Sequence, residues 1–233
     1  DSLALEEYVN ISLPEEYVSI QEIIIRQADP IDLIEKAMSR IPENYGENPN
    51  RLTAFYREGV QRRNEYQIFS EAILDIYKSS YTKSWQTDQV KVIRSRKLIN
   101  ADSRDTVLLK LQAGLSSSLT LDGIKNTFTF LEAVNFHLYD YRMIDIQRLH
   151  DKEVYVVEFK QKPQVTEPLY TGRIFIQQED YAISRIEFGI TPEYISRATD
   201  RFVVNQNRKY TIKPRLANYQ VNYRRYNDKY YLN

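Results

Sequence analysis

The chain has 233 residues, and its 32 Lys and Arg balance its 32 Asp and Glu, so its formal net charge is zero. A neutral chain has no overall field that attracts nucleic acid or an anionic membrane surface, and we predict no nucleic-acid partner. It contains no cysteine, which excludes disulfides, thiolate nucleophiles and cysteine-based zinc sites. The 42% hydrophobic content is sufficient to bury a core, and we expect a lead-in over residues 1–28 and one domain over 29–233.

The first elements expected are a strand and a helix. Residues 17–25 are rich in Ile and Val, as in strands. Asp29 and Pro30 form a helix start, and apolar residues recur with helical spacing as far as Pro42. This pattern predicts a helix over about residues 30–41.

A long hairpin follows. Residues 52–60 and 66–77 alternate between apolar and polar side chains, and the polar segment 61–65 lies at the bend. Counting back from the bend places Arg57 opposite Glu71. Residues 89–99 predict a third strand.

The middle of the chain changes from a two-residue to a helical period. Leu108, Leu111, Leu115 and Leu119 fit one face of a helix that is broken near residues 114–118. We therefore predict a helical insert over residues 105–131 that lays a leucine stripe on the sheet.

Alternation returns from Phe136, with hairpins that turn near His150, Asp180 and Asn227, and a short helix is expected over residues 192–201. The predicted fold class is α+β: a strongly curved, mostly antiparallel sheet of about nine or ten strands, forming an incomplete barrel wrapped around two or three helices. The 19 tyrosines suit such a sheet, because each ring packs on it while the hydroxyl stays at a wet rim.

The concave face of this sheet has two interpretations. The helices either fill it as ordinary core or leave a pocket for an acyl chain or another apolar ligand. The candidate pocket residues are the four leucines of the insert, with wall positions on the strands: Leu108, Leu111, Leu115, Leu119, Tyr56, Ile68, Leu74 and Tyr141. No apolar run approaches the roughly 20 residues that a membrane-spanning helix needs, so no transmembrane segment is predicted.

Catalytic candidates are few. Glu58, Glu71 and Asp75 could make a carboxylate pair for glycan hydrolysis, but an ion-pair ladder with Arg57 and Lys78 is favoured, because Arg57 supplies an obvious partner. His137 and His150 are the only histidines, and without clustered carboxylates they indicate no metal site. No catalytic residue and no cofactor is predicted.

Arg224 and Arg225 lie among five tyrosines near the end of the chain. Arginines next to stacking aromatic rings can bind single-stranded nucleic acid or sugars. The neutral overall charge favours an ordinary polar sheet edge instead.

Several stretches, taken in order, resemble Bacteroidota cell-envelope proteins that contain a carboxypeptidase-like regulatory domain. The resembling segments are SIQEIII (19–25), DP (29–30), IEKA (34–37), IPENY (41–45), FYRE (55–58), SEAILDIYK (70–78), FKQKP (159–163), EPLYTG (167–172) and YAI (181–183). The order of strands and helices is also similar to the lipoprotein-carrier fold, an incomplete barrel with a helical lid.

The resemblance implies export to the periplasm or an outer-membrane association. It also implies an upstream β-sandwich, missing here, whose last strand and exit are residues 1–28. It implies no peptidase zinc site. The leading hypothesis is a non-enzymatic envelope module that holds an apolar, acyl-type ligand or acts as a scaffold. The alternatives are a protein-protein interaction module at the outer membrane, pairing through the last strand with an envelope protein, and a glycan-active hydrolase.

Overall fold

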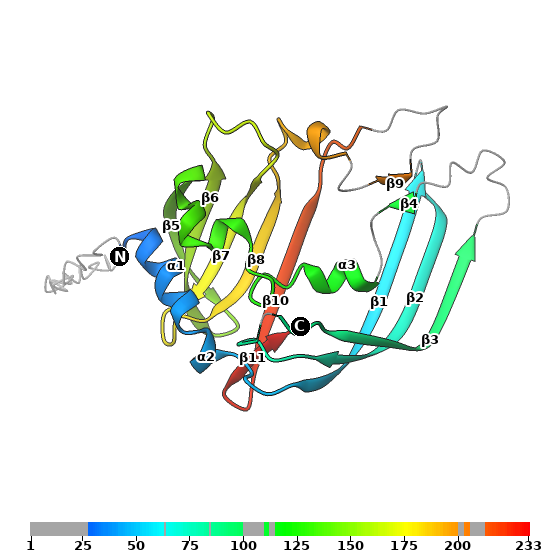
Figure 1. Ribbon diagram of the computed structural model, residues 1–233, viewed down its shortest axis with the longest axis horizontal. Helices are drawn as coiled ribbons and strands as arrows, with labels where there is room; N and C mark the ends of the chain where they lie inside the picture. The colour runs from blue at the N-terminus through cyan, green and yellow to red at the C-terminus, as the bar shows by residue number, and fades with distance from the viewer. Residues whose placement is uncertain are drawn as a thin grey trace, which may run out of the picture.

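A computed structural model describes residues 28–62, 64–83, 85–99, 110–111, 115–199, 203–205 and 213–233 (Figure 1). The α-helices are α1 (Pro30–Ser39), α2 (Ile41–Asn44) and α3 (Leu115–Thr120), and the 3-10 helices are η1 (Thr129–Leu131), η2 (Ala133–Leu138) and η3 (Ile195–Ala198). The strands are β1 (Asn50–Arg62), β2 (Glu65–Lys78), β3 (Gln89–Ile99), β4 (Lys110–Leu111), β5 (Tyr139–Leu149), β6 (Lys152–Gln161), β7 (Tyr170–Gln177), β8 (Ile183–Ile190), β9 (Val203–Asn205), β10 (Asn218–Tyr226) and β11 (Lys229–Leu232). The predicted exit strand within 1–28 lies outside the described residues, apart from Ala28.

The strands form a larger sheet, a smaller sheet and a two-stranded pair. The larger sheet has the order β11-β10-β8-β7-β6-β5, the smaller has the order β1-β2-β3, and β4 pairs with β9. Every strand pair within them is antiparallel. Figure 1 shows the larger sheet on one side, the smaller on the other, and α3 between β10 and β1.

The prediction of a mostly antiparallel α+β fold is confirmed, whereas the single continuous sheet is wrong. Within the described residues, no strand of the smaller sheet pairs with a strand of the larger one, and an isolated parallel bridge joins Tyr45, which follows α2, to Tyr230 of β11. β11 pairs with β10 only as far as Tyr223, so the preceding part of β10 has no strand on that side in the described chain. The sheet is interrupted here because β11 is four residues long while β10 has nine.

The hairpins have the turn conformation and the register that their sequences predict. Both residues of the turns His150-Asp151 and Asn227-Asp228 have positive φ, the conformation that two-residue turns between twisted strands require. In the first hairpin Arg57 is opposite Glu71, as predicted, and the guanidinium lies 2.8 Å from the carboxylate.

The main core lies on one face of the larger sheet, which is called the inner face here. α1 buries Leu33, Ile34 and Ala37 in this core. Phe130 of η1 stacks on Phe159 of β6 with a centroid distance of 4.1 Å. The C-terminal part of the predicted 105–131 insert therefore packs on the larger sheet. The insert is not helical throughout, since residues 110–111 form strand β4 and only α3 and η1 are helical among its described residues.

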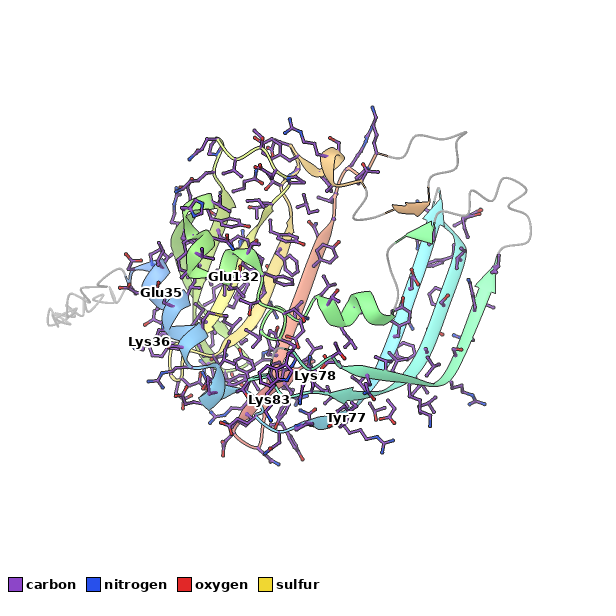
Figure 2. The ribbon with its side chains drawn as sticks, in the orientation of Figure 1. Glu35, Lys36, Tyr77, Lys78, Lys83 and Glu132 are labelled. Carbon is purple, nitrogen blue, oxygen red and sulfur yellow. The ribbon has the colours of Figure 1, made fainter. Side chains whose placement is uncertain are left out.

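A buried ion-pair cluster joins the two sheets. Lys78, the last residue of β2, is fully buried, and its Nζ lies 2.5 Å from Asp88 and 2.7 Å from Asp122. Tyr223 of β10 donates a hydrogen bond of 2.7 Å to the other oxygen of Asp122. The cluster thus connects the smaller sheet, the segment after α3 and the larger sheet (Figure 2 marks Lys78).

Lys125 closes the same cluster. Its Nζ donates to the backbone carbonyls of Ser80 and Lys83, at 2.5 and 2.6 Å. Burial lowers the pKa of Lys125, an effect that the nearby Asp88 and Asp122 carboxylates oppose. The loop between β2 and β3 is therefore tied to the segment that follows α3.

The first prediction concerns Lys78. Lys78→Met leaves Asp88 and Asp122 buried without their cation, which costs about 3–5 kcal/mol of unfolding free energy. Urea denaturation measures the loss. The control is Lys97→Met, because Lys97 lies on the exposed part of β3 and should change stability little. Equal stability of the two variants would contradict the structural role of the cluster.

The second prediction concerns alkaline pH. Burial, followed by the Asp122 charge, raises the pKa of Tyr223 and also that of Tyr81, and burial raises that of Tyr45. Unfolded tyrosine ionises near pH ~10, so the unfolded state loses these protons first as pH rises. Stability is then lost above about pH 10, by up to ~1.4 kcal/mol per pH unit for each tyrosine.

The lowered pKa of Lys125 acts in the opposite direction. As pH rises toward ~10.5, the folded protein loses the proton of this ammonium before the unfolded chain does, which raises stability and offsets part of the loss from the tyrosines. Urea midpoints at a series of pH values between neutrality and about pH 11 measure the slope. Tyrosinate absorbance should rise together with unfolding. A folded protein whose three tyrosines ionise without loss of stability would refute the expected linkage.

Candidate apolar binding site

The smaller sheet has an apolar face, which is called its inner face here. It is formed by alternate residues of the strands, because these point to the same side of a sheet. Leu52 is opposite Ile76, Ala54 is opposite Leu74, and Tyr56 is opposite Ala72. Val90 of β3 extends this face beside Ile76. Leu119 of α3 packs against the cluster that these side chains form: Leu52, Ala54, Tyr56, Ala72, Leu74, Ile76 and Val90.

A cavity of about 650 Å³ lies between this face, α3 and the edge formed by β10 and β11. Its lining is mainly apolar and comes from all three parts: Leu52, Thr53, Ala54, Phe55, Tyr56, Leu74, Ile76, Val90, Ser118, Leu119, Leu121, Asp122, Gln220, Val221, Leu232 and Asn233. Among the described residues of this lining, only Asp122 has a side-chain carboxylate, and its ion pair with Lys78 compensates the charge.

The Tyr56 hydroxyl is the polar group within the apolar wall. It donates a hydrogen bond of 2.8 Å to Glu58 on the same face of β1. Partial burial, followed by the hydrogen bond and charge of Glu58, raises the pKa of Tyr56 to about 12. The phenol therefore stays neutral at physiological pH, and its hydrogen-bonding capacity is directed at Glu58.

Three of the predicted pocket residues meet at this cavity: Tyr56, Leu74 and Leu119. Ile68 lies on the same face of β2 but nearer the hairpin, opposite Val60 and Ile99 and outside the cavity. Tyr141 was misplaced: it lies on β5 in the larger sheet, and its hydroxyl donates 2.8 Å to the carbonyl of Phe130. The error arose because alternation alone does not reveal which sheet a strand joins.

The leucine stripe is only partly helical. Leu111 lies in β4, paired with Val203, so the predicted helix at this position is wrong. Leu115 begins α3, and its side chain is outside what the structure describes, as is the whole of Leu108. A helical spacing of leucines did not exclude a strand here, because two residues are enough to pair with β9.

The wall from the larger sheet was missed. Gln220 and Val221 of β10, with Leu232 and Asn233, come from the end of the chain and meet β1 only through the tertiary fold. The alternation of Tyr219, Val221 and Tyr223 indicates a face, and no local pattern indicates the partner of that face.

The carboxylates considered for hydrolysis do not form a catalytic pair. Glu71 binds Arg57 and Arg96, and Asp75 binds Arg51, on the outer face. Burial raises the pKa of Glu71, but hydrogen bonds from Arg57 and Arg96 outweigh it and the net shift is downward. Glu58 lies on the opposite face. Among the described residues, no group of three or more His, Asp or Glu side chains could hold a metal ion.

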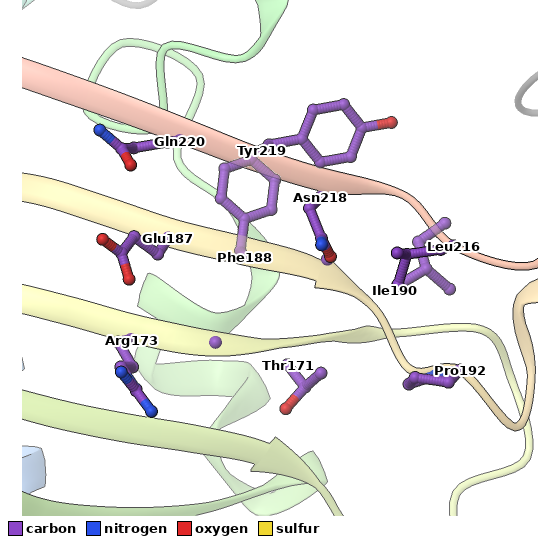
Figure 3. Close-up of a pocket in the computed structure, with 12 residues that line it drawn as sticks. Thr171, Arg173, Glu187, Phe188, Ile190, Pro192, Leu216, Asn218, Tyr219 and Gln220 are labelled. Atoms are coloured by element: carbon purple, nitrogen blue, oxygen red, sulfur yellow. The ribbon is translucent and has the colours of Figure 1, made fainter. Parts of the chain in front are cut away.

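A second hollow, of about 560 Å³, lies on the larger sheet where β7, β8 and β10 run together (Figure 3). Gly172 and Gly189 lie on neighbouring strands there, and a Cβ at Gly172 would stand 2.0 Å from the carbonyl oxygen of Glu187. Arg173 is opposite Glu187 at one end of the hollow. This hollow is open and shallow, and close strand approach accounts for both glycines.

None of the helices in the described residues is long and apolar enough to cross a membrane.

No protein-family model matches the chain, and no curated protein matches it. Among solved structures, it is similar to a domain from Vibrio parahaemolyticus described as an outer membrane lipoprotein-sorting protein domain, with 12% identity and a TM-score of 0.34 over 87% of this chain and 82% of that one. It is also similar to a DUF1329 family protein from Desulfovibrio piger, with 12% identity and a TM-score of 0.28 over 70% and 75% of the two chains. At these scores the likenesses carry no argument about function. The resemblance to envelope proteins with a carboxypeptidase-like regulatory domain stays a prediction.

Proposed function

We propose that this protein is a non-enzymatic binding module of the cell envelope that holds an apolar, acyl-type ligand. The observation that supports this function is the cavity of about 650 Å³ between the smaller sheet, α3 and the β10–β11 edge. Its volume falls within the roughly 300–1,000 Å³ typical of ligand pockets. The envelope location follows from the sequence resemblance and is part of the proposal.

The affinity would come from removing apolar surface from water. Leu52, Ala54, Leu74, Ile76 and Leu119 offer aliphatic surface, and a buried methylene contributes about 0.8 kcal/mol. The carboxylate of Asp122 in the lining is already bound to Lys78 and Tyr223. A chain-like ligand fits this lining better than a polar one, since a polar ligand would lose its water without gaining partners on the aliphatic wall.

The ligand has a direct route between two strand edges. In the described chain, β1 is an outer strand of its sheet, and residues 218–221 of β10 have no strand beside them on that side. The cavity lies between these edges, so a ligand can enter without separation of paired strands.

The same edges support a second candidate function, protein-protein interaction by strand addition. An unpaired edge of β10 or β1 offers backbone donors and acceptors to an extended peptide. The apolar lining favours the acyl ligand over a peptide. A peptide paired with one strand edge would turn the backbone N–H and C=O groups of its other edge toward aliphatic side chains, which offer no hydrogen bonds.

The third prediction tests the acyl ligand. Leu119→Trp and Ala54→Phe each fill the cavity from a different wall. Each should weaken the binding of a fluorescent fatty-acid probe at least about tenfold, which corresponds to ~1.4 kcal/mol. Probe titration measures the dissociation constants. The matched control is Leu98→Trp, because Leu98 is 59% exposed on β3 and does not line the cavity.

Urea denaturation of all three variants separates a filled cavity from a damaged fold. Native mass spectrometry of the unmodified protein gives a second measurement, in which a bound acyl chain adds to the apo mass. No probe uptake by the unmodified protein, or equal weakening by all three variants, would refute the acyl ligand. Strand addition would then be tested by pull-down from envelope extracts.

A further inference from the structure

A third hollow, of about 540 Å³, lies at the end of the larger sheet where β5 turns into β6. It is separate in chemistry from the apolar cavity, because most of its lining is polar or basic: Leu149, His150, Lys152, Gln177, Ser184, Arg185, Gln220, Asn222, Tyr223, Arg224, Arg225, Tyr230 and Asn233. It is called the basic hollow here.

Among the described residues, the side chains that line the basic hollow include four cations and no carboxylate. The cations are Lys152, Arg185, Arg224 and Arg225, from β6, β8 and β10. Acidic partners lie outside the lining: Glu179 binds Lys152, and Asp228 lies 3.1 Å from Arg225. Those carboxylates are largely exposed, so they neutralise their partners incompletely.

Two of the arginines retain free donors. Arg185 is oriented by an Nε hydrogen bond of 2.9 Å to Asn222, and its guanidinium lies over the Phe175 ring at 5.4 Å. Glu187 lies 3.5 Å from its Nη1, which leaves other N–H groups of this guanidinium unengaged. Arg224 has no ion pair or hydrogen bond recorded for its side chain in the described chain. A guanidinium fixed on one side and free on the other is suited to bind an oxyanion.

Gln177 provides an independent observation. It is only 4% exposed, it lines the basic hollow, and its Oε1 is buried without a hydrogen-bond partner among the described residues. A buried acceptor of this kind requires a donor. A fully ionised oxyanion such as a carboxylate offers only acceptors. A ligand that carries a hydroxyl as well as a negative charge would satisfy both Gln177 and the arginines.

We propose that the basic hollow binds an acidic sugar, whose carboxylate or phosphate contacts the arginines and whose hydroxyl donates to Gln177. The polar side chains of Asn222, Gln220 and Ser184 suit further hydroxyls of such a ligand. The two tyrosines of the lining are engaged elsewhere, since Tyr223 binds Asp122 and Tyr230 binds Asp180.

The sugar could be free or could be the headgroup of a lipid. Gln220 and Asn233 line both the basic hollow and the apolar cavity, so the two hollows meet at the edge of β10. An acyl chain in the cavity would place its headgroup at this edge. This second source rests on the proposed function, whereas the free sugar does not.

The test uses three small probes and isothermal titration calorimetry. Glucuronate has the charge and the hydroxyls, glucose has only the hydroxyls, and acetate has only the charge. Glucuronate should bind at least about tenfold more tightly than either, and its affinity should fall as salt is added. Equal affinity for glucuronate and glucose, or no binding of glucuronate at millimolar concentration, would overturn the proposal.

Variants assign the contacts. Arg224→Gln should lower the affinity for glucuronate at least about tenfold. It should leave the affinity for the fatty-acid probe unchanged, because Arg224 does not line the apolar cavity. Gln177→Met should remove most of the difference in affinity between glucuronate and acetate. The control is Arg142→Gln, since Arg142 is an exposed strand arginine outside the basic hollow. Unchanged glucuronate affinity in Arg224→Gln would also overturn the proposal.

A last comparison separates the two sources. If one amphiphile fills both hollows, with its headgroup in the basic hollow, dodecyl glucuronide should bind more tightly than both glucuronate and dodecyl glucoside. Leu119→Trp should then weaken the binding of dodecyl glucuronide. If the sugar is free, dodecyl glucuronide and glucuronate should bind alike and Leu119→Trp should weaken neither. Glucuronate binding with no uptake of any acyl probe would support the basic hollow and refute the proposed acyl ligand.

Discussion

The Lys78 ion pairs are the interaction on which the arrangement of the two sheets depends. One ammonium at the end of β2 meets Asp88, which precedes β3, and Asp122, which follows α3. Tyr223 then connects Asp122 to β10. Within the described chain, no strand pairing joins the smaller sheet to the larger one, so buried ion pairs and hydrogen bonds hold the two sheets together. Because unpaired charges in a core are costly, any arrangement that separates Lys78 from its acids is strongly disfavoured.

This junction also explains why a cavity can exist beside a well-packed core. The larger sheet covers its inner face with α1 and η1, and its core side chains are close-packed aromatics such as Phe130 and Phe159. Among the described residues, the smaller sheet has only the short helix α3 over its inner face, and Leu119 is the α3 side chain that packs there. A helix of six residues cannot cover three strands of eleven to fourteen residues, and the uncovered width is the cavity.

Chemistry is divided between the faces of these sheets. The inner face of the smaller sheet is aliphatic, while its outer face carries the Arg57, Glu71 and Arg96 network. The basic hollow lies at the end of the larger sheet, next to the β10 edge that also borders the apolar cavity. An apolar site and a basic site that share one edge can serve two ligands or one amphiphile.

The sequence by itself determined the strands of the larger and smaller sheets, their hairpin turns and the register of Arg57 with Glu71, because these depend on neighbouring residues and on a two-residue period. It also placed Tyr56, Leu74 and Leu119 on apolar faces, and all three line the cavity. Only the tertiary structure decided that Tyr141 belongs to the other sheet, that Leu111 pairs as a strand, and that Val221 and Leu232 complete the cavity. Periodicity specifies which way a side chain points, whereas the partner it meets depends on contacts between segments that lie far apart in the chain.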